Sequence, residues 1–148
     1  MEAFIIEYFF TEHPNCELAS FGIQWLNLLS NLVFFIVAYL LYRLGGRARW
    51  IGLLVLVSGI GSYVHHIWPA DWSIPFDMFP AVIVGAVALG LSYKNLTRDD
   101  WLLFLGIGTI ALLTLLLDDD LCQFVPFGLH FIWHVSAATI LYLFGRRI

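Results

Sequence analysis

The chain has 148 residues, of which 61% are hydrophobic and only 12% are charged, and its mean hydropathy is +0.86. This composition excludes an ordinary soluble domain and predicts an all-α, polytopic membrane helical bundle. The net charge is −4 and the seven basic residues form no extended basic run, so we do not expect nucleic acid as a partner.

The first segment, residues 1–19, is apolar in part but carries four glutamates and no basic residue. A secretory signal peptide begins with a basic region, so this segment is not expected to be one. We expect it to lie at the membrane interface and to pack on the bundle. No linker or composition break follows it, so residues 1–148 are predicted to form a single transmembrane domain.

Five apolar stretches come next, each close to the roughly 20 residues that cross a hydrocarbon core about 30 Å thick. They cover residues 21–43, 50–67, 77–93, 101–117 and 126–145. Helices are predicted because a segment in lipid must satisfy its own backbone hydrogen bonds. Short connections predict an up-and-down bundle of about five transmembrane helices.

The basic residues fix the expected orientation. They follow the first stretch, the third stretch and the last stretch: Arg43, Arg47, Arg49, Lys94, Arg98, Arg146 and Arg147. Five spans place these three sites on one side, which the positive-inside rule makes cytoplasmic. The N-terminus is then outside and the C-terminus cytoplasmic. We expect a bacterial inner membrane, with an endomembrane location as the alternative.

The two cysteines, Cys16 and Cys122, both fall on the outer side in this topology. Oxidation is permitted there, so a disulfide between the N-terminal segment and the loop after the fourth stretch is favoured. The alternative is two free thiols in unrelated loops.

A polar stripe runs along the first stretch, where Ser20, Gln24, Asn27 and Asn31 are spaced four, three and four residues apart. This spacing places them on one helical face, which should point into the bundle. They either hold helices together or support a nearby site. Asn27 and Asn31 are therefore candidates for residues that contact the site residues and hold them in place.

The histidines predict a metal site. His130 and His134 lie four residues apart on one helical face, as a chelating pair requires, inside the last apolar stretch. The second stretch ends at His65 and His66. Imidazoles are costly in lipid unless they face a partner or a cavity. The topology brings His66 to the level of the pair.

Two further residues reach the same level, Ser62 one turn before His66 and Asp77 at the start of the third stretch. Three imidazoles that leave a fourth position for water are typical of catalytic Zn²⁺. Asp77 is then a candidate general base and Ser62 a candidate oxyanion donor. Alternatively, Asp77 caps the third helix, and His65 is a supporting group or a bystander.

Three sets of residues, in order through the whole chain, are similar to signatures of one family. They are Cys16-Glu17 with Asn27-x-x-Ser30-Asn31, then Ser62-x-x-x-His66 with Asp77 eleven residues later, then Asp118-x-x-x-Cys122 with Leu129-His130-Phe131-Ile132-Trp133-His134. The pattern resembles the alkaline ceramidase family, within the superfamily of intramembrane hydrolases that includes the adiponectin and progestin receptors.

The resemblance implies that His66, His130 and His134 hold Zn²⁺, that Ser62 and Asp77 line the site and that Cys16 pairs with Cys122. It implies hydrolysis of a sphingolipid-like amide. The chain departs from the family, which has seven spans and whose ceramidases carry an acidic calcium site. Gln24 stands where a carboxylate is expected, which argues against bound Ca²⁺ here.

The first hypothesis is therefore a zinc-dependent intramembrane hydrolase that cleaves a ceramide-like amide, or an ester, in a membrane lipid. The second is a non-catalytic membrane receptor or sensor that binds zinc or lipid. The third is a purely structural bundle. A five-helix bundle could complete its lipid pocket as a homodimer.

Overall fold

A computed structural model describes residues 16, 24–70 and 72–148, with the side chain of residue 119 left out. Over these residues the chain is all-helical and contains no strand. The predicted interfacial segment 1–19, apart from Cys16, lies outside the described residues, as does Ser20.

The described helices follow the predicted order. They are α3 (Trp25–Ser30), α4 (Leu32–Leu44), α5 (Ala48–Ile67), α6 (Ile74–Ser92), the short 3-10 helix η1 (Tyr93–Asn95), α7 (Arg98–Leu121) and α8 (His130–Gly145). Only Asn31 separates α3 from α4, so these two helices form one span. The predicted helical bundle is confirmed.

Four of these helical stretches are long and apolar enough to cross a membrane: Trp25–Leu44, Ala48–Ile67, Ile74–Asn95 and Arg98–Asp118. The fifth, α8, has 16 residues and reaches about 24 Å, so it is shorter than the predicted stretch 126–145. The reason is a turn before it, where Gly128 has a left-handed φ of 66°.

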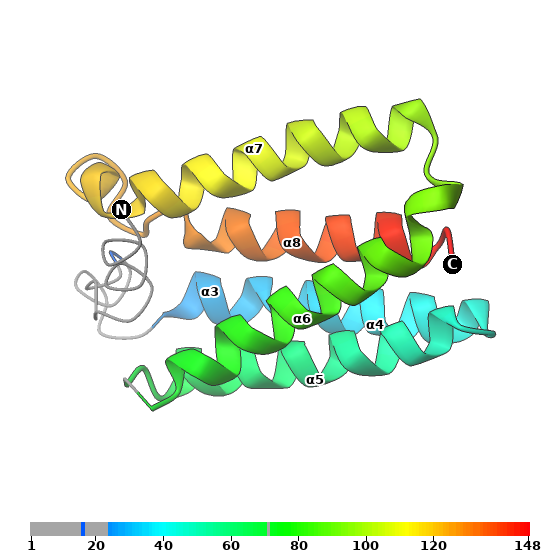
Figure 1. Ribbon diagram of the computed structural model, residues 1–148. Coiled ribbons are helices and arrows are strands. Elements are labelled where there is room, and N and C mark those ends of the chain that lie inside the picture. The colour runs from blue at the N-terminus through cyan, green and yellow to red at the C-terminus, as the bar shows by residue number, and fades with distance from the viewer. Residues whose placement is uncertain (1–15, 17–23, 71) are drawn as a thin grey trace.

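The helix α8 lies at the centre of the bundle, where it packs against α3, α4, α6 and α7 (Figure 1). The α4–α5 pair forms an antiparallel hairpin, and α6 covers α5. Helices α6 and α7 meet at η1 and diverge from there toward the other end of the bundle (Figure 1). The outer part of α7 therefore rests on α8 rather than on α6.

Small residues bring α4 and α5 together. A Cβ added at Gly59 would lie 2.8 Å from the Cβ of Phe34, and one at Gly52 would lie 2.7 Å from the carbonyl oxygen of Ala38. Such close approach is typical of membrane helix pairs. These contacts also set the antiparallel register, with residue 34 opposite residue 59.

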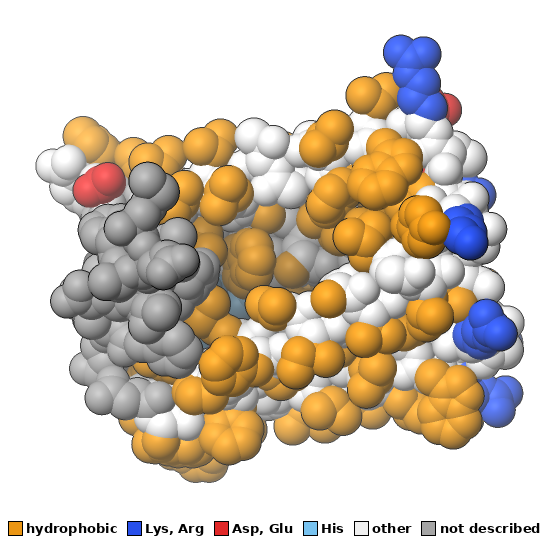
Figure 2. Space-filling view, in the orientation of Figure 1, with side chains coloured by type: hydrophobic (Ala, Val, Ile, Leu, Met, Phe, Trp, Pro, Cys, Tyr) orange, Lys and Arg blue, Asp and Glu red, His pale blue; other side chains and the backbone are white. Residues whose placement is uncertain are grey.

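The basic residues gather at one end of the bundle, which Figure 2 shows on the right. At this end the buried Asp100 carboxylate pairs with Arg146 at 3.1 Å and Arg147 at 2.9 Å. It also accepts hydrogen bonds from the backbone N–H and hydroxyl of Thr97, which close the first turn of α7. The placement agrees with the predicted common side, while its cytoplasmic orientation stays a prediction.

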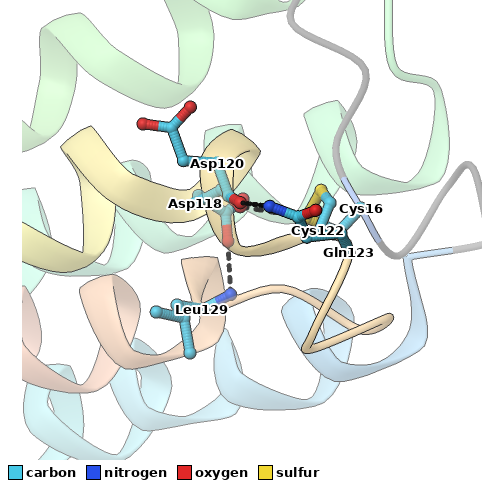
Figure 3. Close-up of a disulfide and its surroundings, with 6 residues drawn as sticks. All are labelled: Cys16, Asp118, Asp120, Cys122, Gln123 and Leu129. Atoms are coloured by element: carbon cyan, nitrogen blue, oxygen red, sulfur yellow. Dashed lines mark hydrogen bonds between the residues drawn. A yellow bond between two sulfur atoms is a disulfide. The ribbon is translucent and has the colours of Figure 1, made fainter.

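The opposite end is closed by a disulfide between Cys16 and Cys122, whose Cα atoms lie 5.2 Å apart, so this prediction is confirmed. Figure 3 shows Asp118 beside it, with its carboxylate accepting a hydrogen bond from the backbone N–H of Leu129. Leu129 precedes the first residue of α8. Asp118 therefore holds the start of α8, the helix that carries His130 and His134, next to the disulfide.

Candidate metal centre

Three histidines from two helices meet at the disulfide end of the bundle. One nitrogen of each of His66, His130 and His134 lies within 4.8 Å of the others. His66 lies in the last turn of α5, whereas His130 and His134 occupy the first two turns of α8. His66 and His134 are buried and His130 is half-buried, so the cluster lies inside the bundle with one member toward its surface.

The three rings meet edge to face. The Nε2 atoms of His66 and His134 are 3.1 Å apart, and the ring centroids of His130 lie 5.3 Å from His66 and 4.8 Å from His134. Two imidazole nitrogens on one tetrahedral zinc ion are separated by about 3.3 Å, because each Zn–N bond is about 2.0–2.1 Å. The observed spacing is close to that value.

Gln24, which precedes α3, sets the tautomer of His66. Its amide oxygen is hydrogen-bonded to Nδ1 of His66, and both side chains are buried. An amide oxygen only accepts, so Nδ1 must carry the proton. In a neutral ring, Nε2 then presents its lone pair to the cluster.

Ser30 does the same for His134. Its hydroxyl donates to the backbone carbonyl of Asn27 at 2.9 Å and lies 2.7 Å from Nδ1 of His134. A hydroxyl has one proton, so the second contact is a bond donated by Nδ1 to the Ser30 oxygen. The lone pair of Nε2 in His134 then faces that of His66.

This donor set fits a divalent cation. Two acceptor lone pairs at 3.1 Å repel each other unless a positive centre lies beside them. Nε2 of His130 is buried and has no hydrogen-bond partner among the described residues. Neutral imidazoles are common zinc ligands, and the second nitrogens of His66 and His134 are hydrogen-bonded as such ligands usually are. The cluster can hold a metal ion, and its geometry alone does not select the element.

His65 is directed elsewhere. Its Nδ1 lies 2.8 Å from the hydroxyl oxygen of Ser73, and that oxygen also lies 2.9 Å from the backbone carbonyl oxygen of Trp68 and 2.7 Å from that of Ala70. This histidine therefore organises the connection between α5 and α6. Among the described residues it does not belong to the three-histidine cluster.

Asp77 lies in the first turn of α6, half-buried and close enough to His65 for an electrostatic interaction. Ser73 is the N-cap position of α6, so the alternative of Asp77 as the capping residue is wrong. The proline at position 75 and Ser73 start the helix three residues before the predicted boundary. Asp77 is outside the group of ligating atoms formed by the three histidines.

Ser62 and the two asparagines lie beside the cluster on the core side. Ser62 is 2% exposed, and Asn27 and Asn31 are fully buried. The carbonyl of Asn27 contacts the Ser30–His134 pair, so Asn27 acts through its backbone. Neither Ser30 nor the Gln24–His66 pair was predicted to support the histidines. The spacing of Gln24 and Asn27 on one inward face was the available signal.

The face between α6 and α7 is hollowed, and Figure 2 shows hydrophobic side chains around the hollow and a histidine side chain at its bottom. Comparisons of the chain with protein-family models, curated proteins and solved structures found no match.

Proposed function

We propose that the chain is a zinc-dependent intramembrane hydrolase that cleaves the amide bond of a membrane lipid. The observation that carries this proposal is the convergence of His66, His130 and His134 with the second nitrogens of His66 and His134 bonded to Gln24 and Ser30. Such support fixes ring orientation and the ligating tautomer.

The ligand number supports catalysis rather than a structural role. His66, His130 and His134 would hold a zinc ion with three imidazoles, the ligand set of catalytic rather than structural sites, and zinc would supply Lewis-acid chemistry at neutral pH. The half-buried His130 stands where the cluster approaches the surface, whereas His66 and His134 anchor it in the core.

Asp77 and Ser62 are the proposed reacting partners. The Asp77 carboxylate takes a proton from the attacking water and delivers it to the leaving nitrogen. The Ser62 hydroxyl, one turn before His66 and without a hydrogen-bond partner in the described chain, donates to the developing oxyanion. The resemblance to alkaline ceramidases implies that both residues line the site.

A lipid substrate follows from the surroundings of the cluster. Four helical stretches are long and apolar enough to cross a membrane, and the hollow between α6 and α7 is lined by hydrophobic side chains, which supports a lipid as the substrate. The proposed substrate is a sphingolipid-like or other acyl amide. We further propose a bacterial inner membrane with the site on the periplasmic side, because the basic residues occupy the other end.

The test measures the zinc content of the purified protein and its hydrolysis of lipids. The purified protein should contain about one zinc ion, which His130→Ala should lose and His65→Ala should keep, since His65 bonds to Ser73. Fatty acid release from N-acyl lipids should require zinc and disappear in Asp77→Ala. Zinc-free protein with an intact fold would refute the proposal. Bound zinc without hydrolysis of any acyl amide or ester would support the receptor or sensor instead.

A further inference from the structure

A polar pair lies one helical turn deeper than the histidine cluster. Helices α4 and α5 are antiparallel, with residue 34 opposite residue 59. Moving three residues along each helix places Asn31 opposite Ser62. The same register places residue 27 opposite residue 66, so the Asn31–Ser62 level directly adjoins the cluster.

The two side chains are buried without partners. Asn31 is 0% exposed and Ser62 is 2% exposed. Both amide atoms of Asn31 and the hydroxyl of Ser62 lack hydrogen-bond partners among residues 24–70 and 72–148. Ser62 does not even bond back to its own helix, as buried helical serines commonly do.

Such groups are costly in a bundle core. A buried polar atom normally has a partner, and an apolar side chain would pack here without the desolvation penalty. Asn31 also separates α3 from α4, where the helix could otherwise continue. Polar atoms left free beside a metal site indicate groups reserved for a ligand.

We propose that Asn31 and Ser62 form a subsite that recognises a secondary amide and thereby selects N-acyl over O-acyl lipids. This inference rests on the proposed function, whose substrate class it specifies. The Ser62 hydroxyl donates to the acyl carbonyl oxygen. The Asn31 amide oxygen accepts from the substrate N–H, and its NH₂ group donates to an oxygen of the head group.

An ester has the carbonyl but not the N–H. It therefore satisfies Ser62 and leaves the amide oxygen of Asn31 unpaired in a desolvated site. Leaving one buried polar group unpaired costs about 5- to 150-fold in affinity. The two residues consequently differ in what they recognise. Ser62 binds the carbonyl oxygen, which both lipids have, whereas Asn31 binds the N–H, which only the amide has.

The experiment uses a matched ligand pair, N-octanoylethanolamine and the octanoyl monoester of ethylene glycol, which differ only by NH and O. Apparent Kd values come from ligand-dependent thermal stabilisation of the zinc-loaded, full-length protein in detergent. Hydrolysis of both ligands is followed in parallel. The wild-type protein should bind the amide about 5- to 150-fold more tightly than the ester.

Two substitutions separate the roles. Asn31→Leu should weaken binding of the amide, so that the Kd values of the amide and the ester become about equal. Asn31→Ala repeats the measurement with a smaller side chain. Ser62→Ala should weaken the binding of both ligands by the same factor, so that the ratio of their Kd values stays unchanged. Ser58→Ala is the matched control, because Ser58 is buried on the same face of α5 one turn further from the cluster.

The outcomes distinguish this inference from the proposed function. An amide preference that Asn31→Leu and Asn31→Ala abolish supports the subsite, even where neither ligand is cleaved and the hydrolase proposal fails. Hydrolysis without an amide preference, or a preference that survives both Asn31 variants, overturns the subsite and leaves the hydrolase standing. A wild-type protein that neither binds nor cleaves either ligand overturns both.

Discussion

Gln24 offers a direct way to perturb the metal centre without touching a ligand. In Gln24→Leu the side chain keeps a similar volume but loses the oxygen that accepts the Nδ1 proton of His66. The ring can then rotate or change tautomer, and its buried N–H loses its partner. Removing a hydrogen-bond partner of a metal-ligating histidine typically weakens metal binding 10- to 100-fold, about 1.4–2.7 kcal/mol.

Zinc affinity is measured by competition with a calibrated chelator in detergent, alongside the thermal stability of the zinc-free protein. Gln24→Glu should bind zinc at least as tightly as the wild type, since a carboxylate also accepts from Nδ1. The matched control is Gln123→Leu, because Gln123 is exposed and contacts only the Asp120 backbone among the described residues. Unchanged zinc affinity in Gln24→Leu, with His66 still required for binding, would refute the reasoning.

Three further substitutions test the frame around the site by thermal or denaturant unfolding. Cys122→Ser should lower the free energy of unfolding by about 2–5 kcal/mol, since the disulfide joins residues 106 apart in the sequence. Equal stability of the oxidised wild type and the variant would contradict this. Gly128→Ala should destabilise the protein by more than about 1 kcal/mol, because φ is 66° and the added Cβ would be crowded, whereas Gly106→Ala, with open space around it, should not. Thr97→Ala should lower the free energy of unfolding by about 1 kcal/mol, because it removes the hydrogen bonds that Thr97 shares with Asp100 at the start of α7. An unchanged free energy of unfolding would contradict this role of the cap.

Much of the fold could be predicted because lipid imposes strong constraints. Runs of about 20 apolar residues predicted four of the helical stretches within a few residues, and the resulting topology brought Cys16 and Cys122 to one end. The same topology placed His66 level with His130 and His134. A regular helical spacing and a fixed membrane thickness were sufficient for these conclusions.

Local chemistry set the limits of prediction. The start of α8 depends on Gly128 and on a carboxylate from another helix, Asp118, and neither is visible as a run of apolar residues. The separation of His65 from His66 depends on Ser73 in the following loop. Hydropathy places residues at a depth, whereas side-chain hydrogen bonds decide which of two neighbouring imidazoles faces the cluster.

The supports of the histidines were harder to predict for a similar reason. Gln24 and Asn27 were assigned to an inward face, but the choice between helix packing and support of a site remained open. The structure joins Gln24 to His66 and Ser30 to His134. These pairs link helices far apart in sequence, so no spacing within one helix could identify them.

The most direct test of a zinc centre is anomalous diffraction at the zinc absorption edge from crystals of the zinc-loaded protein. We predict one peak bonded to Nε2 of His66, Nε2 of His134 and a nitrogen of His130, each at about 2.0–2.1 Å. A map with no peak between these rings, or with zinc bound to His65 in place of His66, would contradict it.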